Sequence, residues 1–170
     1  VGMLTVGWSL VTPPLGASDE PAHIRKAAGV AQSDLRTSYD TFTNAFGQTV
    51  PLTEVRLPQG YAELQHHSCY LNHKDEPTAC AILPDQAGDI GPGTTYVGTY
   101  QPTYYAMVGW VTRVVAPDRG VPLMRILSGL IAAALVASAA VSLRGAGGRG
   151  FTAVGVAAGL TPMALMLMGT

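Results

Sequence analysis

Two acids and an imidazole lie close together near the start of the chain, in the segment Ser-Asp-Glu-Pro-Ala-His at residues 18–23. A carboxylate such as Asp19 or Glu20 can take a proton from a hydroxyl group. Either acid, together with His23, also offers the oxygen and nitrogen donors that bind a divalent metal ion. The same groups can hydrogen-bond a polar substrate, so the residue types alone leave three uses open.

This segment has the signals of a helix start. Serine caps free backbone N–H groups, acids suit the positive end of the helix dipole, and proline is tolerated in the first turn. We therefore predict a helix over about residues 19–32, on which Asp19, His23 and Lys26 share one face. A simpler interpretation is that Asp19 and Glu20 only stabilise the helix end as capping charges.

Composition places this helix beside a membrane. Of the 170 residues, 48% are hydrophobic and only 12% are charged, whereas a soluble domain typically has about 25% charged residues. All 11 acidic residues lie between Asp19 and Asp118, which leaves both ends of the chain apolar. We therefore predict a mainly α-helical integral membrane protein in contact with membrane lipid. The net charge of −1 shows no basic excess, so no nucleic-acid partner is expected.

Three apolar segments are expected to be membrane helices. Residues 121–143 and 151–170 are long enough to cross, because about 20 helical residues reach about 30 Å. Residues 1–12 are interpreted as a truncated first span. The connection at 144–150 carries two arginines and no acid, which favours the cytoplasmic side. We therefore expect a multi-pass protein of the cell membrane, with residues 13–120 outside the cytoplasm.

The extracytoplasmic loop of roughly 90 residues, 13–103, contains the chain's two cysteines, Cys69 and Cys80. We predict a disulfide between them, because oxidising compartments favour such bridges and closing a loop of this size is worth about 2–4 kcal/mol. Two free thiols are one alternative. A metal site is another, and it would use both cysteines with the nearby histidines His66, His67 and His73.

Local patterns suggest three further elements. Residues 49–57 predict a short β-hairpin after Gly47 and Gln48, and the glycine-rich residues 87–95 predict irregular loop. Residues 104–116 have helical spacing of apolar side chains and predict a helix on the membrane surface. Aromatic residues typical of membrane interfaces surround the start of that helix, namely Tyr96, Tyr100, Tyr104, Tyr105 and Trp110.

Three short segments, at residues 12–23, 101–106 and 124–128, carry a resemblance to a known family. In this order they resemble the predicted bacterial membrane proteins of domain-of-unknown-function family 2142, which in turn look like the GT-C glycosyltransferases. In those enzymes an acidic pair follows the first transmembrane helix, opens a surface helix and faces a lipid-linked sugar. The resemblance implies an N-terminal GT-C-like fragment that transfers a sugar from a polyprenyl-phosphate donor to an envelope acceptor outside the cytoplasm.

The same resemblance implies roles for individual residues. Asp19 is the expected base, assisted by Glu20, and a divalent metal ion would be held by Asp19, Glu20 and His23. The residues expected to contact the substrate are His23, Lys26, Tyr104, Tyr105 and Arg125. For Arg125, at the mouth of a span, a phosphate clamp and an anchor to lipid headgroups fit equally well. A second acidic motif is expected beyond residue 170, so this piece alone is not expected to be active.

Two other classes of function fit the same residues. The chain is also consistent with a non-catalytic multi-spanning membrane protein for transport or assembly of envelope polysaccharide, with its loop as a partner-binding lid. A disulfide-stapled binding module anchored by helices is disfavoured, because the loop has a thin apolar pattern for a core of its own.

Overall fold

The computed structural model describes residues 2–17, 19–35, 39–43, 47–67, 69–70, 73 and 75–147. Helices make up about half of the chain, and a small three-stranded sheet accompanies them. The chain divides into two compact units, one of residues 13–121 and the other of residues 1–12 with 122–170. The predicted chemistry falls mainly in the first unit.

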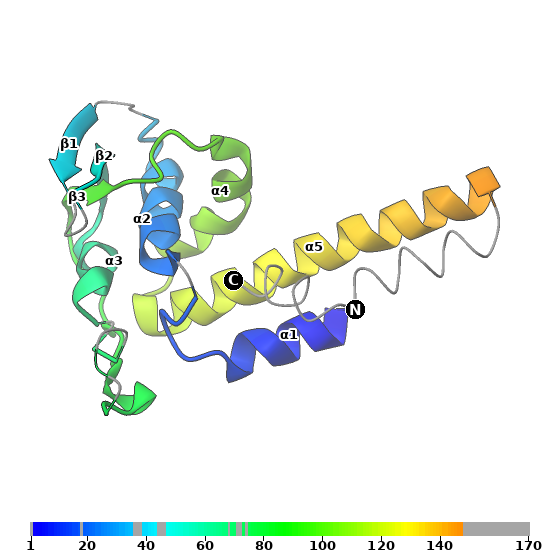
Figure 1. Ribbon diagram of the computed structural model, residues 1–170, viewed down its shortest axis with the longest axis horizontal. Coiled ribbons are helices and arrows are strands. Elements are labelled where there is room, and N and C mark those ends of the chain that lie inside the picture. The colour runs from blue at the N-terminus through cyan, green and yellow to red at the C-terminus, as the bar shows by residue number, and fades with distance from the viewer. Residues whose placement is uncertain are drawn as a thin grey trace. The chain divides into compact units, whose positions relative to one another are not determined.

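Helix α2 (Glu20–Ala31) is the central element of the first unit. It lies between the sheet and helix α4 (Pro102–Gly109) (Figure 1). Its bounds fall within the range of 19–32 expected from the sequence. Ten of its twelve residues are buried, including Ile24, Ala27 and Ala28. Gly29 allows the sheet to approach closely, since a Cβ there would lie 3.1 Å from the Val55 Cβ.

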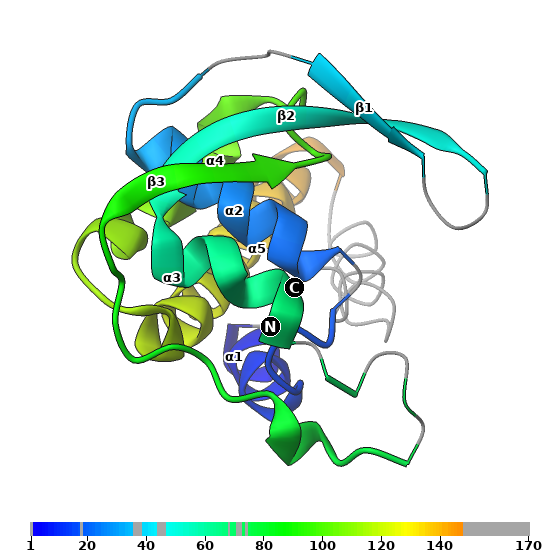
Figure 2. The same cartoon turned by 90° about the vertical axis from the view of Figure 1, so that its left-hand side faces the viewer.

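The sheet is antiparallel, with strand β2 (Thr49–Pro58) between β1 (Tyr39–Thr43) and β3 (Ile90–Thr95) (Figure 2). Alternate side chains of β2 are buried toward α2, as expected for a sheet that is covered on one face. Residues 49–57, predicted to form a short hairpin, instead lie in one strand, which forms a hairpin with β1 and places Tyr39 opposite Thr53.

Residues 87–95 were predicted to be irregular, and strand β3 corrects this for residues 90–95, while 87–89 are irregular as predicted. Pro92 has no N–H to donate and pairs with Arg56, which an edge strand tolerates because one side of it is unpaired. Gly91 and Gly93 lie where side chains of the neighbouring segment come close. A Cβ at Gly93 would be 2.5 Å from Leu57 Cδ2. The glycine and proline content that signalled a loop therefore belongs to a tightly packed edge strand.

A connection of short helices leads from β2 to β3, namely α3 (Gln59–Ala62), η1 (Glu63–His67) and η2 (Thr78–Cys80). The predicted disulfide between Cys69 and Cys80 is present and joins Cα atoms 6.2 Å apart. It closes this connection on itself, in a region with few buried side chains. Among the described residues, no His, Cys, Asp and Glu side chains gather in a group that could hold a metal ion.

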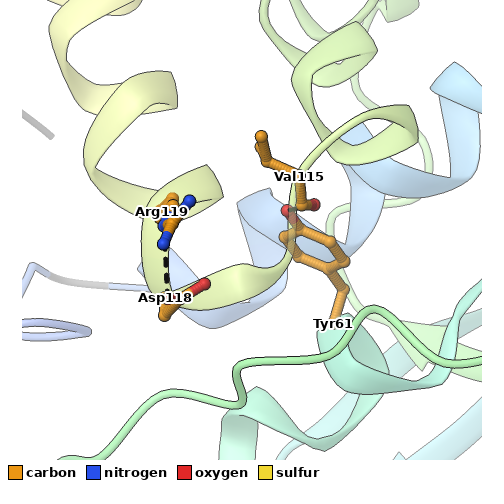
Figure 3. A network of polar contacts seen from close by, with 4 residues as sticks. All are labelled: Tyr61, Val115, Asp118 and Arg119. Carbon is orange, nitrogen blue, oxygen red and sulfur yellow. Dashed lines mark hydrogen bonds and ion pairs between the residues drawn. The ribbon is translucent and has the colours of Figure 1, made fainter.

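Helix α4 continues into the 3-10 helix η3 (Trp110–Arg113), where one helix was predicted over 104–116. Tyr61 ties this region to α3, because its buried hydroxyl donates a 2.8 Å hydrogen bond to the Val115 carbonyl (Figure 3). The neighbouring ion pair of Asp118 and Arg119 spans 3.8 Å and is exposed, so it contributes little to stability.

The second unit contains helix α1 (Gly2–Val11) and most of helix α5 (Pro117–Gly147). Residues 117–142 of α5 have a mean hydropathy of 1.9 and are long enough to cross a membrane. Only 17% of their apolar window is buried, so this helix leaves most of its apolar surface exposed. It contains the predicted span 121–143 and continues through Gly147, into the expected connection at 144–150. The second predicted span, 151–170, lies outside the described residues.

Candidate functional site

Asp19 stands at the N-cap position of α2 with a left-handed backbone, at φ 61°. Aspartate tolerates this conformation better than most residues. Its side chain makes no capping hydrogen bond. The exposed carboxylate instead accepts a 2.6 Å hydrogen bond from the Tyr96 hydroxyl. The side chain of Asp19 therefore bonds to a distant segment and not to the N–H groups of its own helix, while Ser18, the predicted cap, lies outside the described residues.

Tyr96 belongs to a group of tyrosines that we call the tyrosine cluster, defined as Tyr96, Tyr100, Tyr104 and Tyr105. Burial and the hydrogen bond to Asp19 both raise the pKa of Tyr96 well above its usual value. The phenol is therefore protonated at neutral pH and donates to the carboxylate. This donation leaves the second oxygen of Asp19 available to another hydroxyl group, because an ionised carboxylate accepts at both oxygens.

His23 joins the same cluster one helical turn after Asp19. Its Nδ1 lies 2.8 Å from the Tyr105 hydroxyl, and its ring centroid lies 5.8 Å from that of Tyr100. Burial lowers the pKa of His23, and the charge of Asp19 opposes that shift in part. The pKa of Tyr105 is raised to about 12, chiefly by burial. A neutral imidazole and a neutral phenol therefore share this hydrogen bond near pH 7.

Glu20 and Lys26 lie in the interior, whereas Asp19 is exposed. Both are buried, with 4% and 2% of their surface exposed. The Lys26 ammonium donates to the Gly98 carbonyl, and burial lowers the pKa of Lys26, with partial opposition from Asp34. Lys26 thus fixes the turn at 96–100 that carries two of the tyrosines. The structure brings Asp19, His23, Tyr104 and Tyr105 together and places Glu20 and Lys26 in the interior.

Arg125, the remaining predicted site residue, lies in the other unit. Its side chain is 5% exposed, and its Nη1 donates to the carbonyls of Ser9 at 3.2 Å and Thr12 at 2.7 Å. These are carbonyls at and beyond the C-terminus of α1, where helical partners run out. A guanidinium in this position stabilises the helix end.

Tyr96 and Tyr100 are site residues that the sequence reasoning did not select. Tyr96 is 77 positions from Asp19, so no local spacing reveals the pair. The available signal was the run of aromatic residues after the glycine-rich segment, which was interpreted as a membrane-interface feature and, for the non-catalytic alternative, as part of a partner-binding lid.

A hollow of about 310 Å³ opens along β3 and is lined by polar groups of both signs. Its donors and acceptors include Arg25, Glu54, Gln59, Glu63 and His66. Arg25 is 6% exposed, and burial lowers its pKa, with partial opposition from Tyr96. Arg25 lies on α2, the helix that also carries His23, so the hollow and the candidate site share this helix.

The site as described can accept a proton at Asp19, donate hydrogen bonds from phenols, and present aromatic rings. In the described residues, Asp19, Glu20 and His23 do not form a group suited to a metal ion. No curated protein and no solved structure matches the chain. The family model described as a predicted membrane protein, DUF2142, matches residues 3–170, and the chain therefore belongs to this family of membrane proteins.

Proposed function

We propose that the protein is a membrane glycosyltransferase that transfers a sugar from a polyprenyl-phosphate donor to an envelope acceptor on the extracytoplasmic side. The observation that carries the proposal is the exposed Asp19 carboxylate, which is held by Tyr96 and not by the backbone of its own helix. A helix cap has no need of this arrangement. A general base does need an oriented, accessible carboxylate.

In the proposed reaction an acceptor hydroxyl attacks the anomeric carbon of the donor sugar. The new C–O bond forms as the bond from that carbon to the carrier phosphate breaks, and the phosphate leaves with the bonding electrons. The hydroxyl proton passes to Asp19. Tyr96 orients the carboxylate, and the exposed rings of Tyr100 and Tyr104 offer apolar faces to the C–H groups of a sugar.

The proposal gives the buried cations positioning roles. Lys26 and Arg125 are engaged with backbone carbonyls, so neither is assigned a phosphate contact. Glu20 is buried and is not assigned a proton-transfer role. The mixed donors and acceptors of the hollow along β3 suit the hydroxyl groups of the acceptor sugar, since each hydroxyl both donates and accepts.

The test is Asp19→Asn in the full-length protein, assayed for sugar transfer from polyprenyl-phosphate donors in membranes. Loss of a general base should lower the rate by about 100-fold or more. Asp40→Asn is the matched control, because Asp40 is also an exposed acid of this unit, and its hydrogen bond within the described residues is local, from the Thr41 N–H. Unchanged transfer by Asp19→Asn would defeat the assignment.

A second candidate is a non-catalytic protein for transport or assembly of envelope polysaccharide. It is favoured by the exposure of Tyr100 and Tyr104, at 55% and 39%, because ring faces bind a glycan without any base. For this candidate, Tyr100→Ala with Tyr104→Ala should abolish glycan binding, while Asp19→Asn should leave it intact. Binding and transfer measured on the same variants separate the two functions.

A further inference from the structure

The outer face of α4 and η3 carries large apolar side chains exposed at helical spacing. Tyr104, Met107, Trp110 and Val114 are 39%, 45%, 53% and 69% exposed. We call these four residues the interfacial stripe. The opposite face of the segment is also apolar, and there Tyr105, Val108 and Val111 are buried. A helix that is apolar on both faces lacks the polar side that water normally covers.

The buried face already has its partner, which is α2. Gly109 lies so close to Ala27 that a Cβ there would be 2.8 Å from the Ala27 carbonyl carbon and still closer to its oxygen. Helix α2 therefore covers the opposite face of this segment and not the interfacial stripe. A second apolar or amphipathic surface is needed to shield the stripe from water.

Charge and chain continuity identify that surface as lipid. Arg113 is the only charged residue between Asp89 and Asp118, and it is exposed. The segment that carries the stripe therefore has a cation for lipid phosphates and no acid of its own. Tyrosine and tryptophan favour the interface between lipid and water. Val114 is three residues before α5, so the chain allows about 11 Å between the end of the stripe and the start of the apolar helix.

We propose that the interfacial stripe lies in the headgroup region of the bilayer, on the side where α5 begins. The position of the stripe has a consequence for the candidate site. The centroid of the Tyr104 ring lies 5.4 Å from that of Tyr105, whose hydroxyl shares a hydrogen bond with His23 Nδ1. The site then lies level with the headgroups, where a lipid-linked substrate presents its sugar. This last step rests on the proposed function, whereas insertion of the stripe does not.

The experiment measures the depth of Trp110 in the full-length protein, reconstituted in phosphatidylcholine–phosphatidylglycerol vesicles. Lipids brominated either near the headgroup or near the end of the acyl chain quench tryptophan fluorescence at different depths. The signal of Trp110 is the difference between the parent and Trp110→Phe. Trp8→Phe is the matched control, since it removes the other tryptophan of this chain and should leave the Trp110 difference unchanged.

We expect shallow bromines to quench Trp110 at least about twofold more than deep ones, with little access for aqueous iodide. A second reporter, Met107→Trp in the Trp110→Phe protein, should report the same depth from one turn away. Three results overturn the proposal: free access for iodide without quenching by bromine, strongest quenching by deep bromines, or protection from both, which indicates a protein partner. Repeating the measurement with Asp19→Asn separates stripe insertion from catalysis, because that variant should lose transfer and keep the quenching.

Discussion

Tyr61→Phe and Gly120→Ala should each destabilise the protein, but together they should cost less than the sum of the two. Tyr61 is fully buried and its hydroxyl bonds to the Val115 carbonyl at 2.8 Å (Figure 3). Removing that hydroxyl leaves a partly buried carbonyl without this donor, which costs about 1–3 kcal/mol. A Cβ at Gly120 would overlap the same hydroxyl oxygen, and overpacking of this kind costs about 1–3 kcal/mol.

The effects of the two substitutions are not additive, because the atom that the new Cβ of Gly120→Ala would overlap is the hydroxyl oxygen that Tyr61→Phe removes. With the oxygen gone, the nearest ring atom to the new Cβ is Cζ at 3.0 Å, and small shifts relieve a contact of that length. The double variant should therefore recover about 1–2 kcal/mol of the overpacking cost, a normal size for residues in contact. At this chain length that recovery corresponds to about 2–8 °C in Tm.

The assay is thermal unfolding of the detergent-solubilised protein, followed by circular dichroism for both single variants and the double variant. Gly98→Ala provides the matched control, because its Cβ would overlap Thr53 and not Tyr61. Its effect should add to that of Tyr61→Phe. Strict additivity for Tyr61→Phe with Gly120→Ala would refute the reasoning about the hydroxyl.

Three further predictions concern other contacts. Cys69→Ser, Cys80→Ser and the double variant should each lower the free energy of unfolding by the same amount, about 2–4 kcal/mol, because each removes one shared disulfide. The parent protein in reductant should lose the same amount. Unequal decreases in Tm among these samples would argue against a shared disulfide. Gly109→Ala should lower Tm by about 2–12 °C, because the new Cβ overpacks against α2. Gly7→Ala should not lower Tm, because Gly7 has open space around it, and equal effects of the two variants would contradict this packing. Burial lowers the pKa of His23 in the folded state, so the unfolded state binds more protons as pH falls below about 6.5, and acidification should lower Tm. His23→Gln should make Tm less dependent on pH between pH 7 and 5. An unaltered dependence of Tm on pH would contradict this prediction.

The sequence predicted the elements whose signals are local. The helix at residues 20–31 has its start signals in consecutive residues, and α5 contains an uncharged, mostly apolar run over residues 126–143. Strand β3 was not predicted, because its glycines and Pro92 are residues typical of irregular loops. These residues form a strand because they pair with β2, where the side chains of Leu57 and Gln59 come close to Gly93 and Gly91. Leu57 and Gln59 are about 30 positions away in the sequence, so the pattern within residues 87–95 could not reveal the pairing.

The candidate site was predictable in its acids and histidine but not in their partners. Spacing on a helix placed Asp19, His23 and Lys26 on one face, and the structure gives each of them a partner from segment 96–105. The helical period says nothing about depth, however. Lys26 is buried and bonded to the Gly98 carbonyl, whereas Asp19, at the start of the helix, is exposed.

The contact of Arg125 with the end of α1 also constrains the order of events during synthesis. The guanidinium that bonds to the carbonyls of Ser9 and Thr12 lies 116 and 113 residues further along the chain. These two hydrogen bonds can form only after the ribosome has made Arg125. The end of α1 therefore gains part of its final hydrogen bonding late in synthesis, long after its own residues have been made.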